Sequence, residues 1–100
     1  MDSFAHETIA VSNVAKGLTV ATFSPASGPG AQGALIAVEG GAVRFWVDGT
    51  DPTVAVGDVP ATGMPAAAAQ TITLNGQNSL RGFRVIRQTV DATLSVIYLR

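Results

Sequence analysis

Apolar and polar residues alternate with a period of two along most of this chain. Leu94, Val96 and Tyr98, for example, alternate with Thr93 and Ser95. Because successive side chains of a β-strand point to opposite faces, this alternation predicts strands that bury one face. Glycine and proline separate the apolar runs, as is typical of short strands joined by turns. We expect strands at residues 7–14, 18–23, 33–39, 42–48, 53–57, 70–75, 81–88 and 92–99.

This spacing predicts an all-β protein, built as one small β-sandwich or jelly-roll-like barrel of about seven or eight antiparallel strands. The one stretch that favours helix is PAAAAQ, at residues 65–70. Six residues do not sustain a helix in water, because nucleation is costly. We therefore expect a loop or a single turn there.

Glycine, proline and aspartate indicate where the chain turns. Gly40-Gly41 is a signal for a tight hairpin, here joining residues 33–39 to 42–48. Asp48 begins a sequence typical of an Asx turn, in which the carboxylate accepts a hydrogen bond from the backbone two residues on. Asn75-Gly76 ends a later strand. Residues 24–30 contain two prolines and two glycines, which predicts a surface loop.

Length and charge indicate one domain that works against neighbouring molecules. One hundred residues are enough for a single core, so we expect one domain over residues 1–100, with a flexible N-terminal arm at 1–8. Charged residues make up 13% of the chain, against roughly 25% in an ordinary soluble domain. A surface so poor in charge is typical of proteins that assemble, and we expect a homo-oligomer.

The composition argues against several function classes. The net charge is −1, so no basic excess exists to neutralise nucleic-acid phosphates. The apolar runs fall far short of the ~20 residues that cross a bilayer, and we expect no membrane partner. No signal peptide is visible at the N-terminus, which predicts synthesis in a cytoplasm. The absence of cysteine excludes disulfides and thiolate metal sites.

Residues that could carry catalysis are few. The one histidine, His6, lies near the N-terminus, and we interpret it as a surface or edge residue. Asp48, Asp51 and Asp58 are close enough in sequence to ligate Ca²⁺, but their spacing does not match an EF-hand. Turn formation explains the same aspartates. We therefore expect no enzyme and assign no catalytic, cofactor-binding or metal-binding residues.

The residues predicted to meet a partner are Arg44, Trp46, Arg84, Ile97 and Leu99. Arg44 and Trp46 share a strand face opposite the apolar positions of residues 42–48. Trp46 has three interpretations: packing in the second side of a sandwich core, anchoring a subunit interface, or stacking on a sugar. The last strand is apolar on both sides near its end.

Four arginines, out of six basic residues in all, could form a local positively charged patch. The alternative is that they are solvated strand positions or structural ion pairs. These four are Arg44, Arg81, Arg84 and Arg87.

The motif VRFWVDGTDPT, at residues 43–53, resembles a set of short proteins of tailed bacteriophages and prophages. Further similarity lies in a Val-Gly pair at 56–57, in FRVIR at 83–87 and in ATLSVIY at 92–98. Residues 9–19 resemble the first strands of that set, whereas residues 60–70 are longer than its corresponding turn. The resemblance implies a virion-associated protein of the capsid decoration, or cement, kind, commonly a β-rich homotrimer with no catalytic motif.

The function we expect is therefore that of a non-enzymatic structural protein of the virion. It would stabilise the assembled head by bridging subunits of the major capsid protein. The alternative is an adaptor of the tail, neck or fibre, or a module that binds host glycans.

Overall fold

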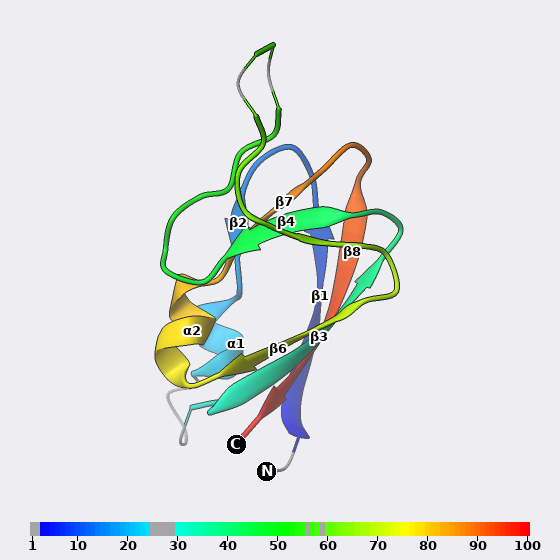
Figure 1. The fold of residues 1–100 in the computed structure, drawn as a ribbon. Coiled ribbons are helices and arrows are strands. Elements are labelled where there is room, and N and C mark those ends of the chain that lie inside the picture. The colour runs from blue at the N-terminus through cyan, green and yellow to red at the C-terminus, as the bar shows by residue number, and fades with distance from the viewer. Residues whose placement is uncertain (1–2, 25–29, 56, 59) are drawn as a thin grey trace.

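The computed structural model describes residues 3–24, 30–55, 57–58 and 60–100. Their strands form two antiparallel four-stranded sheets that pack face to face (Figure 1). Sheet A has the order β1 (Ser3–Val11), β8 (Ala92–Leu99), β3 (Gly33–Glu39), β6 (Thr71–Asn75). Sheet B has the order β2 (Lys16–Gly17), β7 (Arg84–Arg87), β4 (Val43–Trp46), β5 (Met64–Ala66). The predicted all-β sandwich is confirmed.

The strand pairing follows a jelly-roll plan. β1 pairs with β8, β2 with β7, β3 with β6 and β4 with β5, all antiparallel. The chain is therefore one long hairpin that turns back between β4 and β5, and alternate pairs of this hairpin lie in the two sheets. Contacts of β3 with β8 and of β4 with β7 complete each sheet. This wrapping of a hairpin into two sheets is the jelly roll.

The core lies between the sheets and follows the period of two. On β8, Leu94, Val96 and Tyr98 are buried while Thr93 and Ser95 are partly exposed. Two short helices close one end of the sandwich: α1 (Val20–Phe23) and α2 (Gln77–Gly82). Phe23 of the first and Leu80 of the second are both buried in the core. No described helix has the length and apolarity that a transmembrane helix needs.

The strand predicted at residues 18–23 is wrong, because this segment turns into α1. Leu18 and Phe23 are both buried. Five residues apart on a strand they would point to opposite faces, whereas one helical turn lets both side chains enter the core.

The predicted strand at 81–88 begins too early, because residues 77–82 form α2 and β7 starts at Arg84. Leu80 and Phe83 are both buried and three residues apart. This is a helical spacing, which a strand would split between two faces.

The tight hairpin predicted at Gly40-Gly41 is wrong, because β3 and β4 lie in different sheets. β3 is already paired on both sides, with β6 and with β8, and leaves no free edge for β4. The glycines instead carry the chain across the end of the sandwich. A Cβ atom on Gly41 would lie 2.6 Å from Cγ2 of Val90 in the β7–β8 turn, so a larger residue here would have to displace the Val90 side chain.

The segment between β4 and β5 also differs from the prediction. Residues 53–55 and 57 form no strand, and the segment rises as an arm from one end of the molecule (Figure 1). Two threonines hold the base of the arm: Thr62 N–H donates to the Thr53 carbonyl at 3.0 Å, and Thr53 N–H donates to Thr62 Oγ1 at 3.0 Å. The loop or single turn expected at residues 65–70 is found at 67–70, whereas residues 65 and 66 belong to the edge strand β5 (Met64–Ala66). Proline is tolerated there because an edge strand has a side without ladder hydrogen bonds.

Other local predictions can be checked directly. Thr50 N–H donates to Asp48 Oδ1 at 3.0 Å, which confirms the Asx turn. Gly76 has a positive φ of 86° after β6, which confirms the turn there. Residues 3–8 belong to β1 instead of a flexible arm, and residues 1–2 lie outside the described part. Most of the loop predicted at 24–30 also lies outside it.

Candidate interaction surfaces

Three of the predicted interface residues come together on the outward side of sheet B. Trp46 on β4 lies opposite Arg84 on β7, and Arg44 lies opposite Ile86. Neighbours across an antiparallel pair share a face, so Arg44 and Trp46 share one as expected, and the β4–β7 register adds Arg84 to it. All three side chains are partly buried.

The two arginines of this face are used inside the molecule. Arg44 Nη1 donates to the Gly63 carbonyl at 2.9 Å, and Arg84 Nε pairs with Asp51 Oδ1 at 2.7 Å. Both contacts attach the β4–β5 segment to the outside of sheet B. Arg44 Nε is buried and has no hydrogen-bond partner. Both arginines of this face therefore hold the β4–β5 segment in place.

Trp46 does not belong to the core. The core cluster includes Val43 of the same strand, and Phe45 packs against it. Trp46 points to the other side, which excludes the core interpretation and leaves the interface and sugar-stacking interpretations as predictions.

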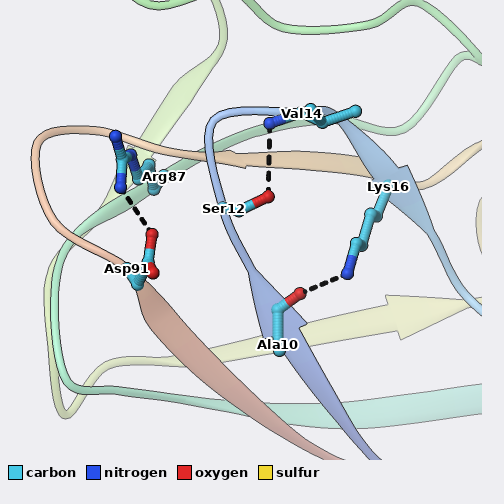
Figure 2. A network of polar contacts seen from close by, with 6 residues as sticks. All are labelled: Ala10, Ser12, Val14, Lys16, Arg87 and Asp91. Atoms are coloured by element: carbon cyan, nitrogen blue, oxygen red, sulfur yellow. Dashed lines mark hydrogen bonds and ion pairs between the residues drawn. The ribbon is translucent and has the colours of Figure 1, made fainter.

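The other arginines have structural contacts as well. Arg87 Nη1 pairs with Asp91 Oδ1 at 2.5 Å across the β7–β8 turn, and the Arg81 guanidinium lies 5.8 Å from the centre of the Phe23 ring. Figure 2 shows the first of these contacts beside the β1–β2 connection, where Lys16 Nζ donates to the Ala10 carbonyl at 2.9 Å. For Arg84 and Arg87, the interpretation as structural ion pairs is confirmed.

The outward side of sheet A is different, because its centre carries no charge. We call it the outer A face and define it by seven residues: Thr8, Leu35, Ala37, Thr71, Thr73, Ser95 and Ile97. Leu35 and Ile97 are directly opposite each other on β3 and β8, and they are 39% and 42% exposed. Thr73, Ala37 and Ser95 border the pair with hydroxyl and methyl groups, whereas His6 and Leu99 border Ile97 on its other sides.

Charged residues lie at the margins of the outer A face, where Ser95 Oγ donates to Glu39 Oε1 at 3.5 Å. His6 lies beside Ile97 on β1, Glu39 ends β3, and the partly exposed Leu99 lies near the end of β8. Ile97 and Leu99 were predicted from the two-sided apolar last strand. Leu35 was missed, although its position within the apolar run ALIAV was a usable signal.

A polar cluster at the edge of the core was also missed. Glu7 points inward from β1 and accepts hydrogen bonds from the Tyr98 hydroxyl, from Thr19 Oγ1 at 2.7 Å and from Thr19 N–H at 3.2 Å. Burial raises the pKa of Tyr98, and the hydrogen bond to Glu7 raises it further. The cluster joins β1, β8 and the start of α1.

The acidic residues have separate roles. The Thr50 N–H that donates to Asp48 lowers the pKa of that carboxyl. Asp51 pairs with Arg84, and Asp58 is exposed in the arm. Across the described residues there is no pocket and no group of three or more His, Cys, Asp or Glu residues that could hold a metal. His6 is exposed on the edge strand β1, as predicted.

Comparisons of the chain with protein-family models, curated proteins and solved structures gave no match. The resemblance to short phage proteins therefore stays a prediction.

Proposed function

We propose that this protein is a non-enzymatic structural component of a tailed-phage virion, a decoration or cement protein that binds the major capsid protein through the outer A face. The observation that carries the proposal is the uncharged centre of this face, where Leu35 and Ile97 lie side by side and exposed. Single exposed apolar residues are ordinary on protein surfaces. Two adjacent exposed apolar residues on one sheet, bordered by hydroxyl and methyl groups, are a stronger indication of an interface than a single one.

Removing water from the centre of the outer A face would cost little free energy when a partner binds. Charged side chains are the most expensive to strip of water, methyl groups cost nothing, and a hydroxyl can rotate to bond a new partner inside the interface. Interface centres are likewise depleted in charge. Thr73, Ala37 and Ser95 border the Leu35–Ile97 pair with short side chains, which allows the partner's backbone to approach closely on that side.

The mechanism of the proposed function is mass action. A protein that binds assembled coat subunits, and not separated ones, shifts the equilibrium toward the assembled shell. Its contribution comes from area buried across neighbouring subunits, and it needs no catalytic group. Jelly rolls occur in viral capsid proteins and also in lectins, so the fold agrees with this function without selecting it.

The test is cosedimentation with expanded, undecorated capsids of the phage that encodes the chain. We expect saturation at a fixed number of copies that corresponds to the capsomer centres or local three-fold sites, together with a higher melting temperature of the shell. Ile97→Lys should abolish binding, because it places an ammonium at the centre of the outer A face.

The matched control is Val20→Lys. Val20 is similarly exposed, at 47%, but lies on α1 at one end of the sandwich and is not part of the outer A face. Binding that survives Ile97→Lys would place the contact elsewhere on the molecule. No binding, or a few copies at one vertex, would contradict decoration and favour the tail, neck or fibre alternative.

A further inference from the structure

β1 is the edge strand of sheet A, and half of its backbone polar groups have no strand beside them. β1 pairs only with β8, through a register that places Thr8 opposite Ser95 and Ile9 opposite Leu94. An edge strand with free N–H and C=O groups is a template for another strand. The question is which of its residues present these groups.

The backbone hydrogen bonds of the neighbouring strands identify these residues, because hydrogen bonding alternates in an antiparallel ladder. Val38 N–H donates to the Gln70 carbonyl at 3.0 Å, so the even-numbered residues of β3 bond to β6. The odd-numbered residues of β3 then bond to β8, and the even-numbered residues of β8 bond to β1. The β1 partners of Leu94 and Val96 are Ile9 and Glu7. The backbone groups of the residues between them point away from the sheet.

Those residues are His6, Thr8 and Ala10. A second contact places them in the same direction, since the Ala10 carbonyl accepts a bond from Lys16 Nζ, which is not part of sheet A (Figure 2). All three side chains are exposed. The Val38–Gln70 and Lys16–Ala10 hydrogen bonds thus both indicate that the backbone groups of these residues point to the open edge.

Along the edge of β1, a lysine and a β-bulge occur only at the two ends, and α1 contacts the strand from the inner side through Thr19 and Glu7. Lysine and β-bulges are the usual devices that block an edge. Lys16 lies at the Ala10 end, and a register shift between Ser3 and Ala5 marks a bulge at the other. Between them there is no proline and no outward charge, because Glu7 points inward to Thr19 and Tyr98.

We propose that two copies of this chain pair antiparallel through β1, about a two-fold axis at Thr8. Thr8 then lies opposite Thr8 of the second copy, and each His6 lies opposite an Ala10. The Ala10 carbonyl has two lone pairs, so it can accept a ladder bond beside Lys16. The two A sheets become one sheet of eight strands with a continuous outer A face.

The second copy fits this edge because the pairing is self-complementary. A two-fold contact uses the same surface twice, so the open window must match itself in reverse. Centred on Thr8, the register sets Glu7 opposite Ile9 and opposes no like charges. The inference does not depend on the phage function, and it predicts a dimer in place of the trimer that the resemblance implies.

The test measures self-association of the isolated protein by sedimentation over a wide concentration series. Thr8→Pro removes an N–H that points to the open edge while keeping the bonds to β8. We expect the dimer Kd to rise by about tenfold or more. The matched control is Thr73→Pro on β6, the opposite edge of sheet A. By the same alternation, its N–H points away from β3.

Cross-linking gives a second readout that does not depend on how well the proline variant folds. The chain has no cysteine, so Thr8→Cys introduces its only thiol. Hydrogen-bonded residues across a ladder have Cα atoms ~5.5 Å apart, which a disulfide can span. Oxidation should therefore link Thr8→Cys protomers as dimers, and should leave Thr73→Cys protomers single.

Two outcomes would overturn the pairing. One is a monomer at every concentration with no cross-link from Thr8→Cys. The other is equal weakening by Thr8→Pro and Thr73→Pro, which would indicate that β1 meets β6 of the next copy. Neither assay contains capsids, so failure of the pairing is separate from failure of the decoration function.

Discussion

At the scale of single residues, the alternation of β1 hides a polar contact inside the sandwich. Glu7 shares its strand face with Ile9 and Val11, so its position predicts a core side chain. Burying a carboxylate is costly unless hydrogen bonds replace its water. Tyr98 and Thr19 supply these bonds. The conflict between residue type and period was visible in the sequence, but the partners were not, because they come from distant segments.

This cluster predicts a loss of stability at high pH. The pKa of Tyr98 is raised by burial and by Glu7, whereas in the unfolded chain it is ~10. Below pH ~10 the protonated Tyr98 makes its full contribution to the free energy of unfolding. Above this pH the unfolded chain releases a proton that the folded protein keeps. The free energy of unfolding should then fall by about 1.4 kcal/mol for each pH unit.

Tyr98→Phe is the control for this prediction. It should lower the stability by about 1–3 kcal/mol at neutral pH, through the lost bond to Glu7, and should remove this part of the alkaline slope. Denaturant titrations over a pH series measure both effects. Tyr98 is the only tyrosine, so tyrosinate absorbance reports its ionisation directly. Ionisation of the folded protein near pH 10 would contradict the raised pKa.

At the scale of elements, the strands with clean alternation were predictable and the places where the backbone turns were not. The bounds predicted for residues 33–39 and 92–99 match β3 and β8. The segment that became α1, VATF, carries β-branched and aromatic residues that also suit strands, whereas α2, QNSLRG, is mostly polar and was predicted as strand only at its last two residues. Their helical turns exist because buried side chains must reach the core from one end of the sandwich, which is a tertiary requirement.

The end of α2 yields a prediction about close packing. The Gly82 carbonyl accepts a hydrogen bond from Gly49 N–H at 2.9 Å. A Cβ atom added to Gly82 would lie 2.4 Å from the Val47 carbonyl oxygen. Because the obstacle is backbone, Gly82→Ala must move the segment that follows β4. We expect a loss of about 3 kcal/mol, measured by denaturant unfolding.

Gly57→Ala is the matched glycine control. Gly57 has a φ of 55°, and a Cβ atom there would meet nothing within 4 Å. Only the cost of the left-handed conformation remains, about 1 kcal/mol. Equal losses for the two variants would mean that the contact between Gly82 and Val47 is not tight.

At the scale of the whole molecule, the sequence carried the fold class but not the wrapping of the chain. A period of two shows that a strand has a buried face, but it does not show which strand lies beside it. The hairpin expected at Gly40-Gly41 is the clearest example, since its glycines serve a crossing between sheets. The outer A face was found only in part for the same reason. Ile97 was predicted, but its neighbour Leu35 becomes a neighbour only through the β3–β8 register.

The jelly-roll wrapping predicts slow, cooperative folding. β1 and β8 come from opposite ends of the chain and must meet before sheet A is complete. Loop closure of that length precedes the contacts that reward it, so we expect refolding in the range of ~ms to seconds. The sheets share one core, and we therefore expect them to unfold together.

The chain provides one spectroscopic reporter in each sheet. Trp46 lies on β4 of sheet B, and Tyr98 lies on β8 of sheet A. Trp46 fluorescence and the near-ultraviolet signal of Tyr98 should give coincident unfolding curves and a single refolding phase outside proline isomerisation. Val96→Ala, a cavity in sheet A at a residue 1% exposed, should shift both curves equally. A shift of the Tyr98 curve alone would mean that sheet B holds its structure without sheet A, which the shared core argues against.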